Sequence, residues 1–308
     1  NMSHSDLMSG VLSPVITPFK DNLEPDSEKL VNHCRWLLDN NVGLAVFGTN
    51  SEGNSLATQE KIDLLDNLVE AGLPPDRMMP GTGCCALPDT IALTRKALEL
   101  GCGGVLMLPP FYYKNISDDG LYRSFAEVIE RIGDDKLRVY LYHIPPVAQV
   151  SVTLPVIERL LKDYPGTVVG IKDSSGDWEN TKTMLDQFKS EKFHIFPGAE
   201  TFMLKSLRHG GAGCISATAN VNPKAIARLA ATWDQNDADE QQAELDRVRA
   251  VFQGYVMIPA MKAAVAYYSK TLSWRNVRPP LDPFDDAQTR TLIASLEALG
   301  FSMNGLEK

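Results

Sequence analysis

The segment from Val168 to Phe188 reads VVGIKDSSGDWENTKTMLDQF and contains one strand followed by one helix. It opens with a short apolar run, rich in β-branched side chains, of the kind that forms a strand buried on both faces. After a turn of small and polar residues, apolar positions recur at helical spacing from Trp178 onward. A strand followed by a helix that covers it is the building unit of a parallel α/β sheet.

The same alternation of short apolar runs and longer amphipathic segments extends along the chain from Gly10. We expect eight strands, at 11–19, 44–49, 77–82, 104–110, 138–145, 168–173, 193–198 and 213–218. The helices that follow them are expected at 27–40, 58–71, 88–100, 117–132, 154–162, 178–188, 201–209 and 223–233. Eight such units in roughly 225 residues match the usual size of a closed barrel, whereas an open doubly wound sheet rarely needs so many strands.

The predicted fold class is therefore α/β, a TIM (β/α)8 barrel with a C-terminal helical appendage. Residues 10–235 would form the barrel that carries the active site, and residues 236–308 a helical region packed on it. Two or three further helices are expected in that region, near 238–253, 258–270 and 286–299. No repeat, low-complexity tract or Ser/Gly-rich linker interrupts the chain, which favours direct packing of the appendage on the barrel.

Composition narrows the class of protein further. The 308 residues are 44% hydrophobic and 22% charged, which is typical of a globular protein with enough apolar material for a core. Thirty basic and 39 acidic side chains give a net charge of -9, so the chain repels polyanions and nucleic acid is not an expected partner. No apolar run approaches the roughly 20 residues of a membrane helix, and no membrane association is expected.

The five cysteines are odd in number and include no CxxC pair, so neither a disulfide framework nor a zinc site is expected. This pattern favours a reducing, cytoplasmic location. Cys84 and Cys85 are adjacent and could be redox-active, but their apolar surroundings favour two buried thiols instead.

Lys172 is the most unusual residue among the strand ends, which in such barrels carry the active site. It completes the apolar run that begins at Val168, so its amine should point into an apolar interior or lie at its rim. Burial disfavours the charged form of a lysine, and the resulting free amine can attack a ketone. The ordinary alternative is an ion pair with a carboxylate such as Asp173, which is the commoner state of a lysine at a strand end.

Two further strand ends carry groups that suit the same chemistry. Tyr142 closes the expected neighbouring strand, where its phenol could relay protons, although a tyrosine in a core often satisfies only one hydrogen bond. Gly48, Thr49 and Asn50 provide a hydroxyl, an amide and backbone N–H groups at a turn that suits a carboxylate. Taken alone, Gly-Thr-Asn usually indicates only a tight loop with local side-chain capping.

Several motifs with their spacing resemble the dihydrodipicolinate synthase/N-acetylneuraminate lyase family. The motifs are Pro14-x-x-Thr17-Pro18-Phe19, Gly48-Thr49-Asn50-Ser51-Glu52, Pro109-Pro110-Phe111-Tyr112, Tyr142-x-x-Pro145, Gly170-Ile171-Lys172-Asp173, Phe196-Pro197-Gly198 and Ile215-Ser216-x-Thr218-Ala219-Asn220-Val221. The resemblance covers about residues 10–221. It implies a homotetrameric class I lyase that forms an imine with pyruvate or a related 2-oxo acid and needs no metal or organic cofactor.

The resemblance also implies a role for each matching residue. Lys172 would form the Schiff base, Tyr142 would shuttle protons, and Thr49 with Asn50 would hold the pyruvyl carboxylate. Tyr112 would be lent across a subunit interface to complete a relay with Thr49 and Tyr142, or would simply pack in a dimer contact. The remaining residues expected to bind substrate are Gly48, Gly198, Ile215, Ser174 and Glu200.

The chain departs from the dihydrodipicolinate synthase pattern at the position that recognises the second substrate. Such synthases carry an arginine two residues after the proline of Tyr-x-x-Pro, and this chain has Val147. An isopropyl group cannot replace a bidentate guanidinium contact with the carboxylate of aspartate semialdehyde. Asn50 and the segment from Lys172 to Asp177 resemble 4-hydroxy-2-oxoglutarate aldolases instead.

Three functions stay open on this basis. The first is an aldolase that cleaves or forms a 4-hydroxy-2-oxo acid from pyruvate and an aldehyde. The second is a condensing synthase or sugar-acid dehydratase that uses the same imine, such as a 4-hydroxy-tetrahydrodipicolinate synthase with altered anchoring. The third is a non-catalytic protein that binds a 2-oxo acid. Product analysis separates the first two, and any turnover eliminates the third.

Overall fold

A computed structural model describes residues 7–306, and the chain divides into two compact units. Unit 1 comprises residues 7–10 and 74–215, and unit 2 comprises residues 11–73 and 216–306. Among these residues no helix is both long enough and apolar enough to cross a membrane.

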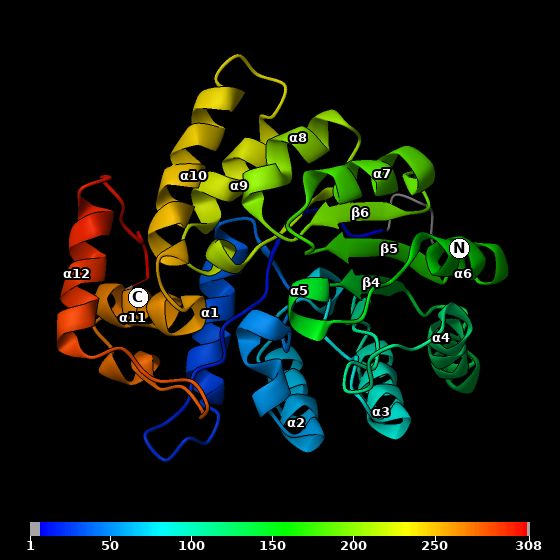
Figure 1. Ribbon diagram of the computed structural model, residues 1–308. Coiled ribbons are helices and arrows are strands. Elements are labelled where there is room, and N and C mark those ends of the chain that lie inside the picture. Colours follow the sequence, from blue (N-terminus) through cyan, green and yellow to red (C-terminus); the bar gives the residue numbers. More distant parts are fainter. Residues whose placement is uncertain (1–6, 307–308) are drawn as a thin grey trace. The chain divides into compact units, whose positions relative to one another are not determined.

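Unit 1 is built on a parallel sheet in the order β3-β4-β5-β6. Its strands are β3 (Val105–Met107), β4 (Val139–His143), β5 (Val168–Asp173), β6 (His194–Pro197) and β7 (Gly213–Ile215). Its helices are α3 (Leu87–Glu99), α4 (Asp118–Ile132), α5 (Pro145–Ala148), α6 (Leu154–Asp163), α7 (Trp178–Phe188) and α8 (Met203–Arg208), with the 3-10 turns η4 (Pro75–Arg77) and η5 (Glu200–Phe202). Figure 1 shows β4, β5 and β6 as neighbouring arrows, and α4 packs between α3 and α6.

Unit 2 contains two short parallel strands and the C-terminal helices. The strands are β1 (Gly10–Ser13) and β2 (Gly43–Leu44), paired with Leu12 opposite Gly43. The helices are α1 (Ser27–Asp39), α2 (Thr58–Glu70), α9 (Pro223–Ala231), α10 (Ala238–Gln253), α11 (Met257–Ser269) and α12 (Asp286–Glu297), with the 3-10 turns η2 (Thr49–Ser51), η3 (Gly53–Ser55), η6 (Ala217–Asn220) and η7 (Leu272–Arg275). Helix α11 packs against α12 and η7.

The eleven helices expected from periodicity are present, with α8 shortened because η5 forms its first turn. Strand β5 spans all of the expected range 168–173, the other strands are shorter than their apolar runs, and the strand expected at 77–82 is wrong. That segment makes one isolated bridge, Gly81 with Leu106, flanked by hydrogen bonds from Thr82 N to Leu106 O and from Leu106 N to Pro80 O. Pro80 has no N–H to donate, which prevents a continuous ladder. Helix α5 was not expected, because two prolines open it.

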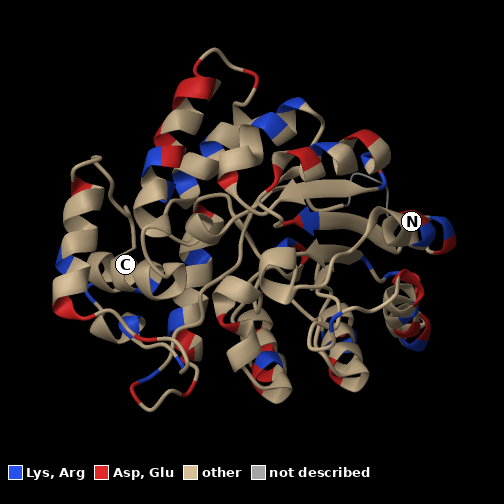
Figure 2. Cartoon of the chain, in the orientation of Figure 1, with Lys and Arg blue, Asp and Glu red and all other residues tan. Residues whose placement is uncertain are grey.

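Charged residues gather on the helices and loops of unit 1, while the arrows of β4 to β6 are largely uncharged in Figure 2. Helix starts are specified locally, since the side chains of Ser117, Thr153 and Asp177 accept hydrogen bonds from backbone N–H groups of the first turns of α4, α6 and α7. The outward polar faces and inward apolar faces thus follow from the periodicity of the sequence.

Tyr140 fills the interior of unit 1 because its neighbours in the sheet lack side chains. A Cβ on Gly170, its register partner in β5, would lie 2.5 Å from Tyr140 Cδ1, and one on Gly104 would lie 2.5 Å from Cε2. The phenol accepts a hydrogen bond from Met8 N at 2.8 Å. Burial raises the pKa of Tyr140 to about 12, so this hydroxyl is a structural group.

His33 is the corresponding buried polar group of unit 2. Its ring lies 5.7 Å from that of Trp36 and 5.3 Å from that of Trp274, measured between centroids. Asn220 Oδ1 accepts a hydrogen bond from Ile16 N, and its contact of 3.3 Å with His33 Nε2 therefore requires the proton on that nitrogen. His33 Nδ1 is buried with no hydrogen-bond partner among residues 7–306, and burial lowers the pKa of His33 to about 4.

We expect the free energy of unfolding to fall as the pH decreases from about 6.5 to about 4. The pKa of His33 is 6.5 in the unfolded chain and about 4 in the folded chain, so between these values the unfolded chain binds a proton that the folded chain does not. Neutral His33 therefore makes its full contribution to the free energy of unfolding above about pH 6.5. Between about pH 6.5 and about pH 4 that free energy falls by about 3 kcal/mol. Urea unfolding at pH 7 and pH 4.5 measures the loss. His33→Phe is the control, and an equal loss in both proteins would contradict the assignment.

Candidate active site

Lys172 and Tyr142 are brought side by side by a shift in the pairing of β4 with β5. Val139 pairs with Val168, but Tyr142 pairs with Lys172, so β5 contains one extra residue between these two points. Without the shift, Tyr142 would pair with Ile171. The side chains of Ile171 and Lys172 lie on opposite faces of the sheet, so the phenol would then be on the face away from the amine. The bulge therefore places the amine and the phenol on the same face.

The pair is almost fully buried. Lys172 is 3% exposed and Tyr142 is 2% exposed. Lys172 Nζ donates a hydrogen bond to Tyr142 Oη at 3.4 Å and lies 4.4 Å from the centroid of the phenol ring. On the other side of Lys172, its register partner in β6 is Phe196. The amine thus lies among aromatic groups, with one hydroxyl within reach for proton transfer.

Asp173 does not neutralise Lys172, which was the ordinary alternative. Successive side chains of a strand point to opposite faces, and Asp173 turns toward the start of α7. Its carboxylate accepts hydrogen bonds from Ser175 N at 2.9 Å, Asn180 Nδ2 at 3.1 Å and Thr181 Oγ1 at 2.6 Å. Within residues 7–306 no carboxylate lies within ion-pair distance of Lys172.

His143 pairs with Asp173 in the register of β4 and β5 and shares its face of the sheet. Its Nδ1 accepts a hydrogen bond from Val152 N at 3.0 Å, which fixes the proton on Nε2. Burial lowers the pKa of His143, and the negative charge of Asp173 opposes that shift. These two residues anchor the strand ends from behind, while Tyr142 and Lys172 occupy the other face.

The remaining predicted residues of unit 1 lie at the ends of β5, β6 and β7. Gly198 N donates to Asp173 O at 2.8 Å, and a Cβ at Gly198 would overlap Ser174 Oγ, so the two residues are in contact. Glu200 is buried in η5. Ile215 is buried at the end of β7. The structure brings Ser174 and Gly198 together, and it gives no direct contact between Glu200 and Lys172.

Gly48, Thr49 and Asn50 form a tight turn in unit 2. Gly48 precedes η2, and its carbonyl accepts hydrogen bonds from Ser51 N and Gly53 N at 3.1 and 3.0 Å. Thr49 and Asn50 are partly exposed, whereas Ser51 is buried. The backbone of this turn is therefore closed on itself, and the Thr49 and Asn50 side chains are partly accessible.

The residues that hold this turn were missed by the sequence interpretation. Glu52, which separates η2 from η3, forms a buried ion pair with Lys262 of α11. Arg278 contacts the same carboxylate through its backbone N–H at 3.0 Å. A signal was present, since Lys262 interrupts the apolar stretch Met257–Ala266 as Lys172 interrupts its own strand.

Tyr112 lies apart from the buried pair. It is 74% exposed, and its ring contacts that of Tyr113 edge-on, at 5.4 Å between centroids. Lys114 Nζ donates hydrogen bonds to Phe111 O and, at 2.8 Å, to Ala148 O, which ties the loop after β3 to α5. Val147, in α5, is 62% exposed.

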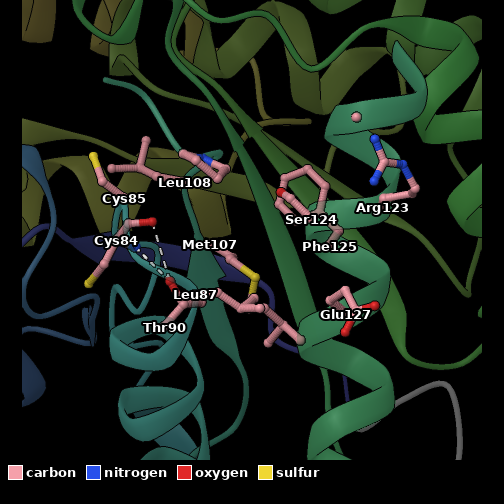
Figure 3. A pocket seen from close by; sticks show the side chains of 13 residues that line it. Cys84, Cys85, Leu87, Thr90, Met107, Leu108, Arg123, Ser124, Phe125 and Glu127 are labelled. Atoms are coloured by element: carbon pink, nitrogen blue, oxygen red, sulfur yellow. Dashed lines mark hydrogen bonds between the residues drawn. The ribbon is translucent and has the colours of Figure 1, made fainter. Parts of the chain in front are cut away.

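A cavity of about 290 Å³ lies between α3 and α4 (Figure 3), and Lys172 is not among the residues that line it. Cys84 and Cys85 line one end of it, and Phe125 and Glu127 line the side formed by α4. The expectation of two buried thiols is wrong, because Cys85 is exposed and Cys84 is only partly covered. The apolar positions around them face the cavity instead of closing over the thiols. Thr90 Oγ1 accepts a hydrogen bond from Cys84 N at 2.9 Å.

No group of three or more His, Cys, Asp or Glu side chains arranged to hold a metal ion occurs within the described part of the chain. The Tyr142 phenol lies within hydrogen-bond distance of Lys172, which suits proton transfer. The five cysteines are free thiols.

Comparison with known proteins identifies the family to which this geometry belongs. The model of the dihydrodipicolinate synthetase family matches residues 7–299. A DapA-like lyase of Chloroflexus aurantiacus is 35% identical over 293 residues, covering 94% of this chain and 96% of the relative. A 4-hydroxy-tetrahydrodipicolinate synthase of Thermus thermophilus is 32% identical over 285 residues, covering 90% and 91%.

Solved structures agree with the fold class. The dihydrodipicolinate synthase of Agrobacterium tumefaciens superposes with a TM-score of 0.87 at 30% identity, covering 95% of this chain and 99% of that one. A 2-keto-3-deoxygluconate aldolase variant of Sulfolobus solfataricus shares the fold, with a TM-score of 0.84 at 23% identity over 94% and 96%. The fold is the α/β, (β/α)8-barrel class predicted from the alternation of elements, and the chain belongs to the dihydrodipicolinate synthetase family.

Proposed function

We propose that the protein is a class I lyase that forms a Schiff base between Lys172 and pyruvate or a related 2-oxo acid. The observation that carries the proposal is a buried lysine amine with a phenol at 3.4 Å and no carboxylate within ion-pair distance in residues 7–306. An amine in this setting has no ion pair that must be broken before it attacks a ketone. Membership of a family of lyases and synthases supports the same chemistry.

The proposed reaction proceeds through an iminium ion and an enamine on Lys172. The free amine of Lys172 attacks the C2 carbonyl of the 2-oxo acid to give a carbinolamine, which takes up a proton on its hydroxyl and loses water to give an iminium ion. Loss of a proton from C3 gives an enamine, which attacks the carbonyl carbon of an aldehyde; the new C–C bond forms and the aldehyde oxygen takes up a proton to become the 4-hydroxyl group. Water then hydrolyses the imine and releases a 4-hydroxy-2-oxo acid, and cleavage is the reverse. Tyr142 Oη is the group that would carry protons to and from the carbinolamine oxygen.

We assign the remaining groups to substrate binding. Thr49, Asn50 and the backbone after Gly48 would hold the carboxylate of the 2-oxo acid, because hydroxyl, amide and N–H donors converge on one turn. Gly198 and Ile215 would form the wall around the imine, and no metal or organic cofactor is needed. Ser174 and Glu200 would meet the polar end of the second substrate.

Val147 favours an aldolase that uses an aldehyde other than aspartate semialdehyde. The side chain is exposed on α5 and presents no donor to a carboxylate. Lys114 is near α5, but two of its donors are engaged by Phe111 O and Ala148 O, and Arg208 is exposed on α8. The alternative is a 4-hydroxy-tetrahydrodipicolinate synthase, the activity that names several relatives, or a sugar-acid dehydratase that acts through the same imine. Non-catalytic binding of a 2-oxo acid is the third candidate, and it would not require the buried amine of Lys172.

We further propose a homotetramer, a dimer of dimers, in which Tyr112 is shared between active sites. Tyr112 and Tyr113 expose two adjacent aromatic rings, and such rings are enriched at protein interfaces. Within the tetramer, the Tyr112 hydroxyl would extend the proton relay of Thr49 and Tyr142. A reducing cytoplasm is the compartment that the five free thiols favour.

Treatment with pyruvate and borohydride should inactivate the protein irreversibly and add the mass of a reduced pyruvyl group to the peptide that contains Lys172. Borohydride traps the imine as a stable secondary amine. Lys172→Ala should abolish both labelling and turnover, while Lys162→Ala, which removes an exposed lysine of α6, should change neither. Peptide mass spectrometry makes the measurement. Label on a different lysine would refute the assignment.

Tyr142→Phe should lower kcat by about 100-fold while changing KM for the 2-oxo acid only slightly, because it removes a proton carrier and little contact area. The ring and its packing beside Lys172 are retained. Tyr113→Phe is the matched control, since it removes a hydroxyl from an exposed ring. Steady-state kinetics measure both constants, and an unchanged kcat would show that Tyr142 is only a packing residue.

Val147→Arg should raise kcat/KM for aspartate semialdehyde by about 100-fold, because a charge-assisted bidentate contact is restored. The exposed position leaves room for the longer side chain. Wild type should prefer glyoxylate or short hydroxy-aldehydes, and Val147→Leu controls for size. If wild type uses aspartate semialdehyde best and the substitution adds nothing, the synthase alternative replaces the aldolase.

A further inference from the structure

A buried cluster of charges in unit 2 surrounds Glu52. The side chains of Lys262 and Glu52 are 0% and 1% exposed and form an ion pair. Lys262 Nζ also donates to Asn276 O at 2.7 Å. The second oxygen of Glu52 accepts the backbone N–H of Arg278 at 3.0 Å, so both oxygens of the carboxylate are engaged.

Arg278 links Glu52 to Ser55 and Glu60, which lie further along the segment that follows Glu52. Its guanidinium binds the two carboxylate oxygens of Glu60 at 2.7 Å each and donates to Ser55 O at 2.8 Å and Leu23 O at 2.9 Å. Glu60 in turn accepts the N–H of Ala57 and closes the first turn of α2. The segment from Glu52 to α2 is therefore held at its beginning, at its end and at the helix that follows.

The backbone around Glu52 requires such support. Glu52 has φ 56° and Phe47 has φ 66°, left-handed values that residues other than glycine adopt rarely. A Cβ on Gly53 would lie 2.7 Å from the Phe47 carbonyl carbon, so the chain passes too close to itself for any side chain there. Glu52 N donates to Thr49 O at 3.2 Å, which transmits the position of Glu52 directly to Thr49.

The ion pair is a costly way to stabilise a fold. Burial lowers the pKa of Lys262 to about 8, even though Glu52 raises it, so desolvation outweighs the attraction. Apolar residues of similar volume often stabilise an interior as well as a buried pair does, without its geometric precision. The ammonium and the guanidinium lie 4.5 and 4.8 Å from the centroid of the Phe19 ring, which covers them.

We propose that Lys262 and Arg278 are positioning residues that, through Glu52, fix the Gly48–Ser51 turn in the geometry that binds the carboxylate of the 2-oxo acid. This inference rests on the proposed function, because it takes that turn to be the carboxylate site. Neither residue touches substrate. Their contribution is the orientation of Thr49 and Asn50, and displacing donors of this kind by about 1 Å can cost on the order of 100-fold.

The test compares pyruvate with methyl pyruvate, which has the same reactive ketone and no charged carboxylate. Borohydride trapping at Lys172 is measured by mass spectrometry against the concentration of each compound. In Lys262→Met, the half-saturating concentration of pyruvate should rise by about 10- to 100-fold, and that of methyl pyruvate by less than about 3-fold. Lys224→Met, which removes an exposed lysine of α9, should behave as wild type with both compounds.

A purely structural role would affect both compounds equally, and that result, or an unchanged response to pyruvate in folded Lys262→Met, would overturn the proposal. If Lys262→Met does not fold, as judged by its thermal transition, Glu52→Gln is tested instead, because Gln keeps the size and one acceptor for Arg278 N. The same loss of discrimination is expected there. Failure of the proposed function gives a different result, since wild type would then show no trapping at Lys172 or no preference for pyruvate over methyl pyruvate.

Discussion

The one-residue shift in the pairing of β4 with β5 is the constraint on which the proposed chemistry depends. A strand alternates its side chains between two faces, so the shift decides whether Tyr142 meets Lys172 or Ile171. It also sets the other face, where His143 pairs with Asp173. A uniform ladder from Val139 onward would place the phenol beside an aliphatic side chain and leave the amine without the hydroxyl that we propose as its proton carrier.

Periodicity and strand-end position predicted the helices, the fold class and the burial of Lys172, because each is a property of residues close together in sequence. The bulge could not be predicted in this way, since Val168 and Val169 are equally suited to either register. The prediction that Cys85 is buried was wrong, because its apolar neighbours in the sequence do not reveal that the residues around it line a cavity. The assignment of Tyr112 to a shared active site stays a prediction.

Lys172 and Lys262 show two ways of burying an amine, and the sequence marks both in the same manner. Each interrupts an apolar segment, one at the end of β5 and the other within α11. Lys262 meets a carboxylate and a carbonyl, which keep it charged and fixed in place. Lys172 meets the hydroxyl and the ring face of Tyr142, which in the proposed mechanism carries protons to and from the bound substrate. Both amines are buried, so the environment of each one is what distinguishes the structural role of Lys262 from the reactive role proposed for Lys172.

The direction of Asp173 completes this distinction. The carboxylate is adjacent to Lys172 in sequence, and an ion pair between them would stabilise the ammonium form that cannot attack a ketone. Alternation along β5 sends the carboxylate to the opposite face, and Thr181 and Asn180 of α7 then satisfy its oxygens. Because Asn180 and Thr181 of α7 already donate hydrogen bonds to the Asp173 carboxylate, turning it toward the amine of Lys172 would break these bonds. In the proposed mechanism, the fold keeps the nucleophilic lysine out of an ion pair by engaging the nearest carboxylate elsewhere. A Lys-Asp sequence at a strand end is compatible with that mechanism where the covering helix supplies hydrogen-bond donors to the carboxylate, as Asn180 and Thr181 do here.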